Sequence, residues 1–244
     1  MDKVKLSLGD VARISLNRPE KKNALDKQLL VELKDALDAV KNSKASVLVL
    51  TGEGDTFCSG LDRNLLMGLV KGEMDEKDLR KAIDLVQEII FDIRTMKIPV
   101  IAAVKRYAIG GGLQLALAAD IRIATPGTIF SVKELDFGII PDMGALYILP
   151  KIVGDGVARD MIYTRREIRA EEAKILGLVN EIYEDLEKGI DEYTKKLLSV
   201  PNFALREAKM LIEKGWNQNF KENLLDTKEA QVRCVMEAVG KFKR

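Results

Sequence analysis

Short apolar runs that alternate with helical stretches constrain the fold of this chain more than any other feature of its sequence. Three runs have the length and composition of buried strands, at residues 47–50, 100–104 and 121–124. Between them, apolar residues recur three and four positions apart, first after Asp26, which can cap a helix, and again between residues 83 and 93. This alternation of strands and helices predicts an α/β fold.

The two ends of the chain depart from that alternation. Residues 4–16 place alternating apolar residues on either side of Gly9-Asp10, which predicts a β-hairpin. Residues 129–150 contain several glycines and prolines, so we expect mostly loop there, with Pro150 marking an end. Helical patterns at 204–212 and 230–242 then predict a helical C-terminal third.

Composition excludes several classes of protein. The chain has 244 residues, no histidine and a formal net charge of +1. Without histidine, Ser-His-Asp and Cys-His catalysis and histidine-ligated zinc sites are impossible, and the balanced charge argues against a dedicated nucleic-acid-binding protein. With only Cys58 and Cys234, one chain can form neither a disulfide framework nor a four-thiolate zinc site. We expect no metal site.

The expected location is the cytoplasm. The first eight residues alternate charged and apolar side chains, unlike a signal peptide. No stretch approaches the roughly 20 apolar residues that span a bilayer. We therefore expect a protein without a membrane partner, in a reducing compartment.

Two glycine-bearing loops could point backbone amides into a cavity. Residues 56–62 follow one predicted strand, and Gly110-Gly111-Gly112 follows another, and each precedes a helix. Glycine lets the backbone approach a ligand closely, and a helix start offers unpaired N–H groups. Two such loops could form an oxyanion hole, although tight strand-to-helix turns explain either loop on its own.

Four segments, taken in order, resemble the enoyl-CoA hydratase/isomerase family, also called crotonases. They read NRPEKKNAL (17–25), TFCSGLD (56–62), IAAVKRYAIGGGLQLALAADIRIAT (101–125) and FSVKELDFGIIPDMGALYILPKIVG (130–154). The resemblance implies a crotonase-like spiral of ββα repeats over residues 1–190 and a helical oligomerisation or capping region over 191–244. It further implies an acyl-CoA thioester substrate, no cofactor beyond its coenzyme A, and a homotrimer or hexamer.

The family pattern also implies site residues. The amides of Ser59 and Gly111 would donate to the thioester oxygen, where removal of an α proton builds an enolate. Glu134 would be the acid–base group, with its pKa raised by an apolar acyl pocket, unless it is an ordinary solvated residue. Where hydratases carry a second glutamate, this chain has Gln114, which can orient a water but cannot take its proton.

Asp142 leaves two interpretations open. The resemblance to dienoyl-CoA and ring-epoxide isomerases implies a catalytic aspartate there, while its place after Pro141 also suits a helix N-cap. With Gln114 in place of a carboxylate, we expect double-bond isomerisation somewhat ahead of hydration. A non-catalytic acyl-CoA-binding relative is a third hypothesis.

Coenzyme A contacts follow only from the resemblance. It implies that Lys22, Ala24, Leu61 and Asp62 line the nucleotide and pantetheine path, with Lys22 near the phosphates. Lys22 could instead be an ordinary solvated residue of a basic turn, and Asp62 could instead cap the following helix. The final residues 241–243 resemble a family helix that lends an aromatic ring and a lysine to the coenzyme A of a neighbouring subunit.

Overall fold

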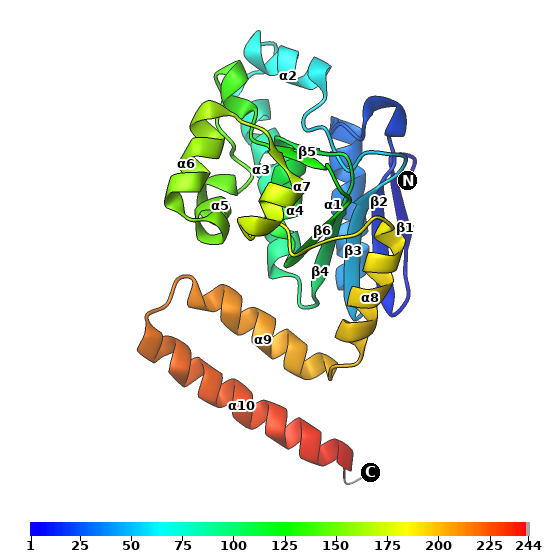
Figure 1. Cartoon of the computed structure of the whole chain (residues 1–244), viewed down its shortest axis with the longest axis vertical. Helices are drawn as coiled ribbons and strands as arrows, with labels where there is room; N and C mark the ends of the chain where they lie inside the picture. The colour runs from blue at the N-terminus through cyan, green and yellow to red at the C-terminus, as the bar shows by residue number, and fades with distance from the viewer. Residues whose placement is uncertain (243–244) are drawn as a thin grey trace.

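The computed structural model describes residues 1–242 and contains two sheets over that range (Figure 1). The larger sheet has the order β1-β2-β3-β4-β6-β9, namely Val4–Ser7, Val11–Leu16, Val47–Gly52, Val100–Val104, Ile121–Ala124 and Glu181–Ile182. Strands β1 and β2 form the predicted antiparallel hairpin, and the other neighbours are parallel. The smaller sheet has the order β5-β7-β8, namely Tyr107–Ile109, Ile129–Ser131 and Ile168–Arg169.

Helices connect and cover these strands. In chain order they are α1 (Lys27–Lys41), α2 (Arg63–Val70), α3 (Glu76–Thr95), α4 (Gly111–Ala118), α5 (Ala145–Val153), α6 (Asp155–Thr164), α7 (Ala170–Ile175), α8 (Leu186–Leu198), α9 (Asn202–Gly215) and α10 (Phe220–Phe242). Two short 3-10 helices, η1 (Pro19–Lys21) and η2 (Glu134–Phe137), complete the set. Asp26 caps α1 as expected, because its side chain accepts a hydrogen bond from the Leu29 amide.

Successive turns of the chain repeat one pattern. Strands β3, β4 and β6 each enter the larger sheet, and the chain that follows then pairs in a second layer. In two turns the second layer receives β5 and β7, and after β3 it receives Cys58, which bridges to Ala108 of β5 in parallel. A helical segment follows each time. This arrangement confirms the α/β spiral, and the likeness to solved structures given below supports it.

The larger sheet has a core on each face because its strands alternate. Leu48 and Leu50 of β3 are buried in the main core with α1, α3 and α4. Val47 and Val49 face a smaller core, which α8 closes with residues such as Ile190. Residues on both faces are fully buried, which explains why the sequence of β3 is continuously apolar.

Helices α9 and α10 form a hairpin that stands off the body (Figure 1). Helix α8 spans residue 190, the expected division, and packs on the larger sheet. Lys209 fastens α9 to the body, since its ammonium donates to the Ile98 carbonyl (2.9 Å) and to Asp120 (2.7 Å). The expected contribution of side chains 241–243 lies outside the described residues.

The segment 129–150 is more regular than its glycines and prolines suggest. It contains β7, η2 and the first part of α5. The expectation for Pro150 was wrong, because this residue lies inside α5, whose apolar residues Ile148 and Leu149 are buried. Their burial offsets the hydrogen bond that proline cannot make. Within residues 1–242, none of the helices is long and apolar enough to cross a bilayer.

Candidate active site

The loop after β3, the start of α4 and η2 together line a cavity of about 540 Å³. Ser59, Leu61, Gly111 and Glu134 all reach it. Apolar side chains form much of the remaining wall: Leu66, Met67, Ile109, Phe137 and Ile139. Segments that are far apart in the sequence thus share one partly apolar cavity, which Ser59, Gly111 and Glu134, the candidates for the oxyanion hole and for acid–base chemistry, reach together with Leu61.

The two glycine loops touch each other beside this cavity. A Cβ atom built on Gly60, whose φ is +94°, would lie 2.8 Å from the Ile109 carbonyl oxygen and 3.6 Å from the Gly111 nitrogen. Only glycine accommodates both this contact and that backbone conformation. Gly110, with φ +52°, plays the same part for the carboxylate, because its Cβ would lie 3.2 Å from Oε1 of Glu134.

The predicted role of the Ser59 amide needs correction. Its N–H donates to the carbonyl oxygen of Lys22 at 3.0 Å. A backbone N–H already committed to a backbone acceptor is not free for a thioester oxygen. The order of residues in the loop identified the right segment, but it did not reveal which amide faces the cavity.

The free amide of this loop belongs to Leu61. Leu61 bridges to Leu25 in parallel, and the bridge uses the carbonyl of Gly60 (2.8 Å) and the N–H of Asp62 (2.9 Å). Because neighbouring peptides in an extended chain point in opposite directions, the Leu61 N–H faces away from Leu25. In residues 1–242 neither this N–H nor that of Gly111, the first residue of α4, donates to a protein acceptor.

Glu134 is buried, which excludes the solvated alternative. Its side chain is 9% exposed, Oε1 accepts from Nε2 of Gln114 (2.8 Å), and Oε2 accepts from the Lys133 amide (3.0 Å). Burial raises the pKa of Glu134 above its ordinary value, and the charge of Asp142 acts in the same direction. A carboxyl group with a raised pKa is suited to taking and returning a proton near neutral pH.

Gln114 is a connector within the protein. Besides donating to Glu134, its Oε1 accepts from the amides of Met143 (2.9 Å) and Ala145 (3.2 Å), and the residue is 1% exposed. Both lone pairs of the amide oxygen are therefore used. Because the oxygen has no free lone pair, a water could not donate to this side chain. One N–H of Nε2 is left and could donate to a water.

Asp142 does not cap a helix. Gly144 is the N-cap of α5, and no side chain supplies a capping hydrogen bond there. Asp142 is half-buried, and burial raises the pKa of its carboxyl group. It lines a neighbouring cavity of about 360 Å³, whereas Glu134 lines the larger one. Asp142 is therefore close enough for its charge to influence Glu134, but the two carboxylates line different cavities.

The residues expected along the coenzyme A path differ in their burial and in the contacts that they make. Asp62 caps α2, as one of its two interpretations predicted, because its side chain accepts a hydrogen bond from the Asn64 amide (2.8 Å). It also pairs with Arg18 (2.6 Å). Ala24 is buried. Lys22 is exposed, lies 5.4 Å from the centre of the Tyr107 ring, and forms no ion pair in residues 1–242. Its ammonium group is free to meet an anion.

This geometry defines a class of site: two free backbone amides beside one buried carboxylate in a partly apolar cavity. Such a site suits proton transfer next to a carbonyl group whose oxygen becomes negatively charged. No group of acidic or cysteine side chains in the described part of the chain is arranged to hold a metal ion.

Comparison with known proteins identifies the family. The enoyl-CoA hydratase/isomerase family model matches residues 8–238, and the chain belongs to that family as an acyl-CoA enzyme. It is 36% identical to a crotonyl-CoA hydratase of Syntrophomonas wolfei, over 84% of this chain and 78% of that protein. It is also 37% identical to a peroxisomal Δ(3,5)-Δ(2,4)-dienoyl-CoA isomerase of Arabidopsis thaliana, over 74% of this chain and 69% of that one.

Solved structures show the same fold. The fold is similar to that of a Thermobifida fusca YX protein crystallised with acetoacetyl-CoA, with a TM-score of 0.88 and 31% identity over 97% of this chain and 96% of that one. Relatives named as hydratases and as isomerases thus stand at similar sequence identity, so the family alone does not choose between the two reactions.

Proposed function

We propose that this enzyme moves a double bond along the acyl chain of an enoyl-CoA. The observation that carries the proposal is Gln114, a neutral amide whose oxygen is committed to two backbone N–H groups. Glu134 then remains as the buried carboxylate of the cavity next to the two glycine loops, since Asp136, which also lines it, is exposed and paired with Arg165. Isomerisation needs one carrier that takes a proton from C2 of a 3-enoyl thioester and delivers one to C4.

The amides of Leu61 and Gly111 would bind the thioester oxygen during this transfer. When the C2–H bond breaks, its electron pair moves into the thioester and the oxygen becomes an enolate anion. Each preorganised donor aimed at such an oxygen contributes about 3 kcal/mol to transition-state stabilisation. The chemistry involves only proton transfer, so we propose no cofactor beyond the coenzyme A of the substrate.

Glu134 would act as the mobile acid–base group, and Asp142 as a second carboxylate that modulates it. Burial already disfavours the charged form of Glu134, which makes proton return to carbon easier. Lys22 would meet a phosphate of coenzyme A, with Ala24, Leu61 and Asp62 nearby along the path. Its free, exposed ammonium supports that role.

Hydration of a 2-enoyl-CoA is the second candidate, because Gln114 keeps one N–H that could hold a water and relatives include hydratases. Purified enzyme given crotonyl-CoA and a 3-enoyl-CoA separates the two. We expect the 3-enoyl substrate to gain the absorbance of a conjugated thioester faster than crotonyl-CoA loses it. The opposite order would establish hydration, and turnover of neither would refute both.

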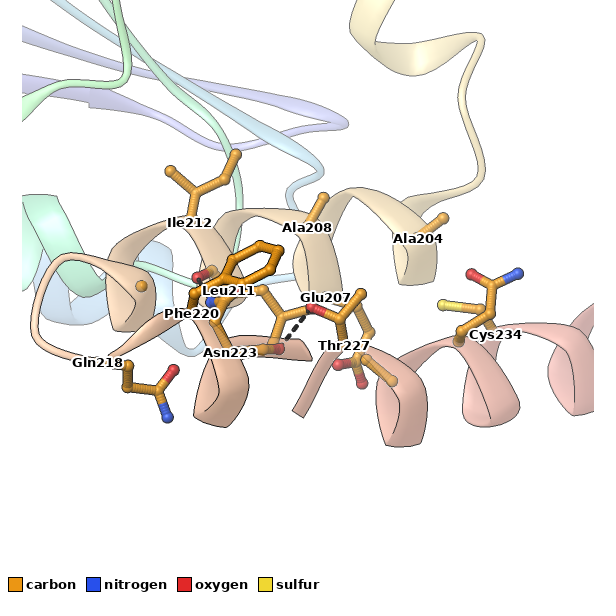
Figure 2. Close-up of a pocket in the computed structure, with 13 residues that line it drawn as sticks. Ala204, Glu207, Ala208, Leu211, Ile212, Gln218, Phe220, Asn223, Thr227 and Cys234 are labelled. Carbon is orange, nitrogen blue, oxygen red and sulfur yellow. Dashed lines mark hydrogen bonds between the residues drawn. The ribbon is translucent and has the colours of Figure 1, made fainter. Parts of the chain in front are cut away.

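We propose assembly into trimers, or dimers of trimers, in which the C-terminal hairpin contributes contacts between subunits. Figure 2 shows side chains of α9 and α10 around a groove of about 730 Å³. Large apolar side chains are exposed on these helices: Ile212, Phe220, Leu224, Leu225, Val235 and Met236. Exposed apolar surface of this extent marks an interface. Light scattering should give three or six times the chain mass, and Leu225→Glu should lower it.

We also propose a reducing, cytoplasmic location. Cys58 and Cys234 are both free thiols, and burial raises the pKa of Cys58 to about 12, which keeps it protonated and inert. Cell fractionation with a specific antibody would test the location.

A further inference from the structure

Asn23 is a fully buried polar residue that the proposed chemistry does not use. It is 0% exposed, and its φ of +54° is a left-handed conformation that asparagine tolerates better than most residues. Its side-chain oxygen accepts from the Arg18 amide (2.7 Å), and its Nδ2 donates to the carbonyls of Glu53 (3.0 Å) and Thr56 (2.7 Å). These three hydrogen bonds hold the exit of β3 and the start of the next loop together.

The backbone around Asn23 pairs with that loop. Four hydrogen bonds join the two segments: Ser59 N to Lys22 O (3.0 Å), Cys58 Sγ to Asn23 O (3.1 Å), Leu25 N to Gly60 O (2.8 Å) and Asp62 N to Leu25 O (2.9 Å). The carbonyl of Lys22 and both backbone groups of Leu25 are therefore engaged by the loop. Residues 22–25 act as a strand-like brace beside it.

The loop is held on its other side by β5. The Cys58 N–H donates to the Tyr107 carbonyl (3.0 Å), and the Cys58 carbonyl accepts from Ile109 (3.1 Å). The end of β3, the start of the loop and the Asn23 side chain are tightly packed. A Cβ atom on Gly52 would lie 2.4 Å from the Thr56 carbonyl oxygen and 2.6 Å from Nδ2 of Asn23. Any shift of the brace must therefore move the loop, and with it the Leu61 amide.

We infer that Asn23 is a positioning residue for the oxyanion site. It touches no substrate atom; it fixes the brace, which in turn fixes the direction of the Leu61 N–H toward the cavity. This inference rests on the proposed function of the Leu61 and Gly111 amides. Because a hydrogen bond to an oxyanion depends on placement within a fraction of an ångström, losing the brace should weaken it strongly.

The test uses acetoacetyl-CoA, a β-keto thioester whose enolate absorbs in the near ultraviolet. An oxyanion site lowers the pH at which the bound ligand becomes an enolate, so a spectroscopic titration measures the site without turnover. Asn23→Gly removes the side chain and keeps the left-handed backbone free of strain. We expect a 10- to 100-fold weaker enolate equilibrium, with a clearly smaller loss of affinity for coenzyme A alone, whose proposed contacts Lys22 and Ala24 lie on the same segment.

Thr51→Val is the matched control, because it removes a buried hydrogen bond near the same end of β3 (Thr51 Oγ1 to Ala103 O, 2.9 Å) without touching the loop. It should lower the melting temperature and yet titrate like the unmodified enzyme. Asn23→Ser, which retains one hydroxyl donor, should lie between. If Asn23→Gly folds and titrates like the unmodified enzyme, the inference is wrong and the proposed function stands.

If the unmodified enzyme binds acetoacetyl-CoA without promoting enolate formation, the proposed oxyanion site fails and the inference falls with it. If neither the glycine nor the serine variant folds, Asn23 serves the stability of the whole chain, which equally overturns a specific positioning role.

Discussion

Replacing Gln114 with methionine should move the pH dependence of the enzyme and lower its stability together. Methionine has a similar size and keeps the buried site filled. It removes the donor to Glu134 at 2.8 Å and the acceptor for the amides of Met143 and Ala145 at 2.9 and 3.2 Å. The three lost hydrogen bonds have separable consequences.

The hydrogen bond to Glu134 favours its charged form and holds its pKa below the value that burial alone would give. A hydrogen bond to a charged group contributes about 1.5–3 kcal/mol, and its loss should raise the pKa of Glu134 further. The acid limb of the pH–rate profile should therefore move to higher pH, by roughly one to two pH units if that whole contribution is lost. The two buried N–H groups of Met143 and Ala145, left without an acceptor, should also lower the free energy of unfolding by about 2–6 kcal/mol.

The sign of the stability effect depends on pH. A carboxyl group whose pKa is higher in the folded than in the unfolded protein opposes folding once pH exceeds the unfolded value, about 4.3 for glutamate. Relative to the unmodified enzyme, the additional loss of stability in Gln114→Met should therefore grow only as pH rises from the folded pKa of the unmodified Glu134 to the still higher folded pKa in the variant, and then level off. Denaturant unfolding at several pH values measures this.

Gln114→Glu is the informative companion variant. It keeps an oxygen for Met143 and Ala145, but it brings a second carboxyl group to Glu134, so the pair should share one proton and titrate with a raised apparent pKa. Stability near pH 5 should then be retained. An unmoved acid limb in Gln114→Met, with activity intact, would refute the idea that Gln114 sets the proton affinity of Glu134.

Three further outcomes are expected. Glu134→Gln should lower kcat by about a hundred- to ten-thousand-fold while acyl-CoA affinity, measured by calorimetry, stays the same; an unchanged rate would remove Glu134 from the chemistry. Asp142→Asn should leave the melting temperature nearly unchanged because Asp142 caps no helix, and kcat should fall if it is a second proton carrier; full activity would leave Glu134 as the one carrier. Lys209→Met should cost about 2 kcal/mol of stability by unfastening α9 from Asp120, and hydrogen exchange should show faster opening of α9 than of α8.

The main strands and helices were predictable because their signals are local and repeated. Residues 100–104 and 121–124 are strands at the predicted bounds. The first is a continuous apolar run, which suits a sheet buried on both faces, and the second is apolar except for Arg122. The strands of the smaller sheet were not predicted. With two or three residues each, they carry too few side chains to show a period, and tertiary contacts decide their conformation.

The candidate site was predictable as a set of segments and less so as a set of atoms. The two glycine loops and Glu134 could be recognised in the sequence, because each of these positions needs a particular type of residue. The choice between the Ser59 and Leu61 amides depends instead on pairing with residues 22–25. Lys22 lies 37 positions before Ser59, and Leu25 lies 36 positions before Leu61. Backbone amides carry no residue-type signal, so only the hydrogen-bond register could identify the free one.

Gln114 shows why substitution at one position can change a reaction without changing a fold. Its amide oxygen satisfies the Met143 and Ala145 amides, as a carboxylate oxygen would, so the start of α5 does not depend on which of the two groups is present. The other end differs: an amide can only donate to Glu134, whereas a carboxyl group there could exchange a proton with it or with a water. The supporting contacts therefore constrain the size and shape of this side chain, while its protonation chemistry is free to vary. Measuring both hydration and isomerisation in Gln114→Glu asks whether that single exchange moves the enzyme from one reaction toward the other.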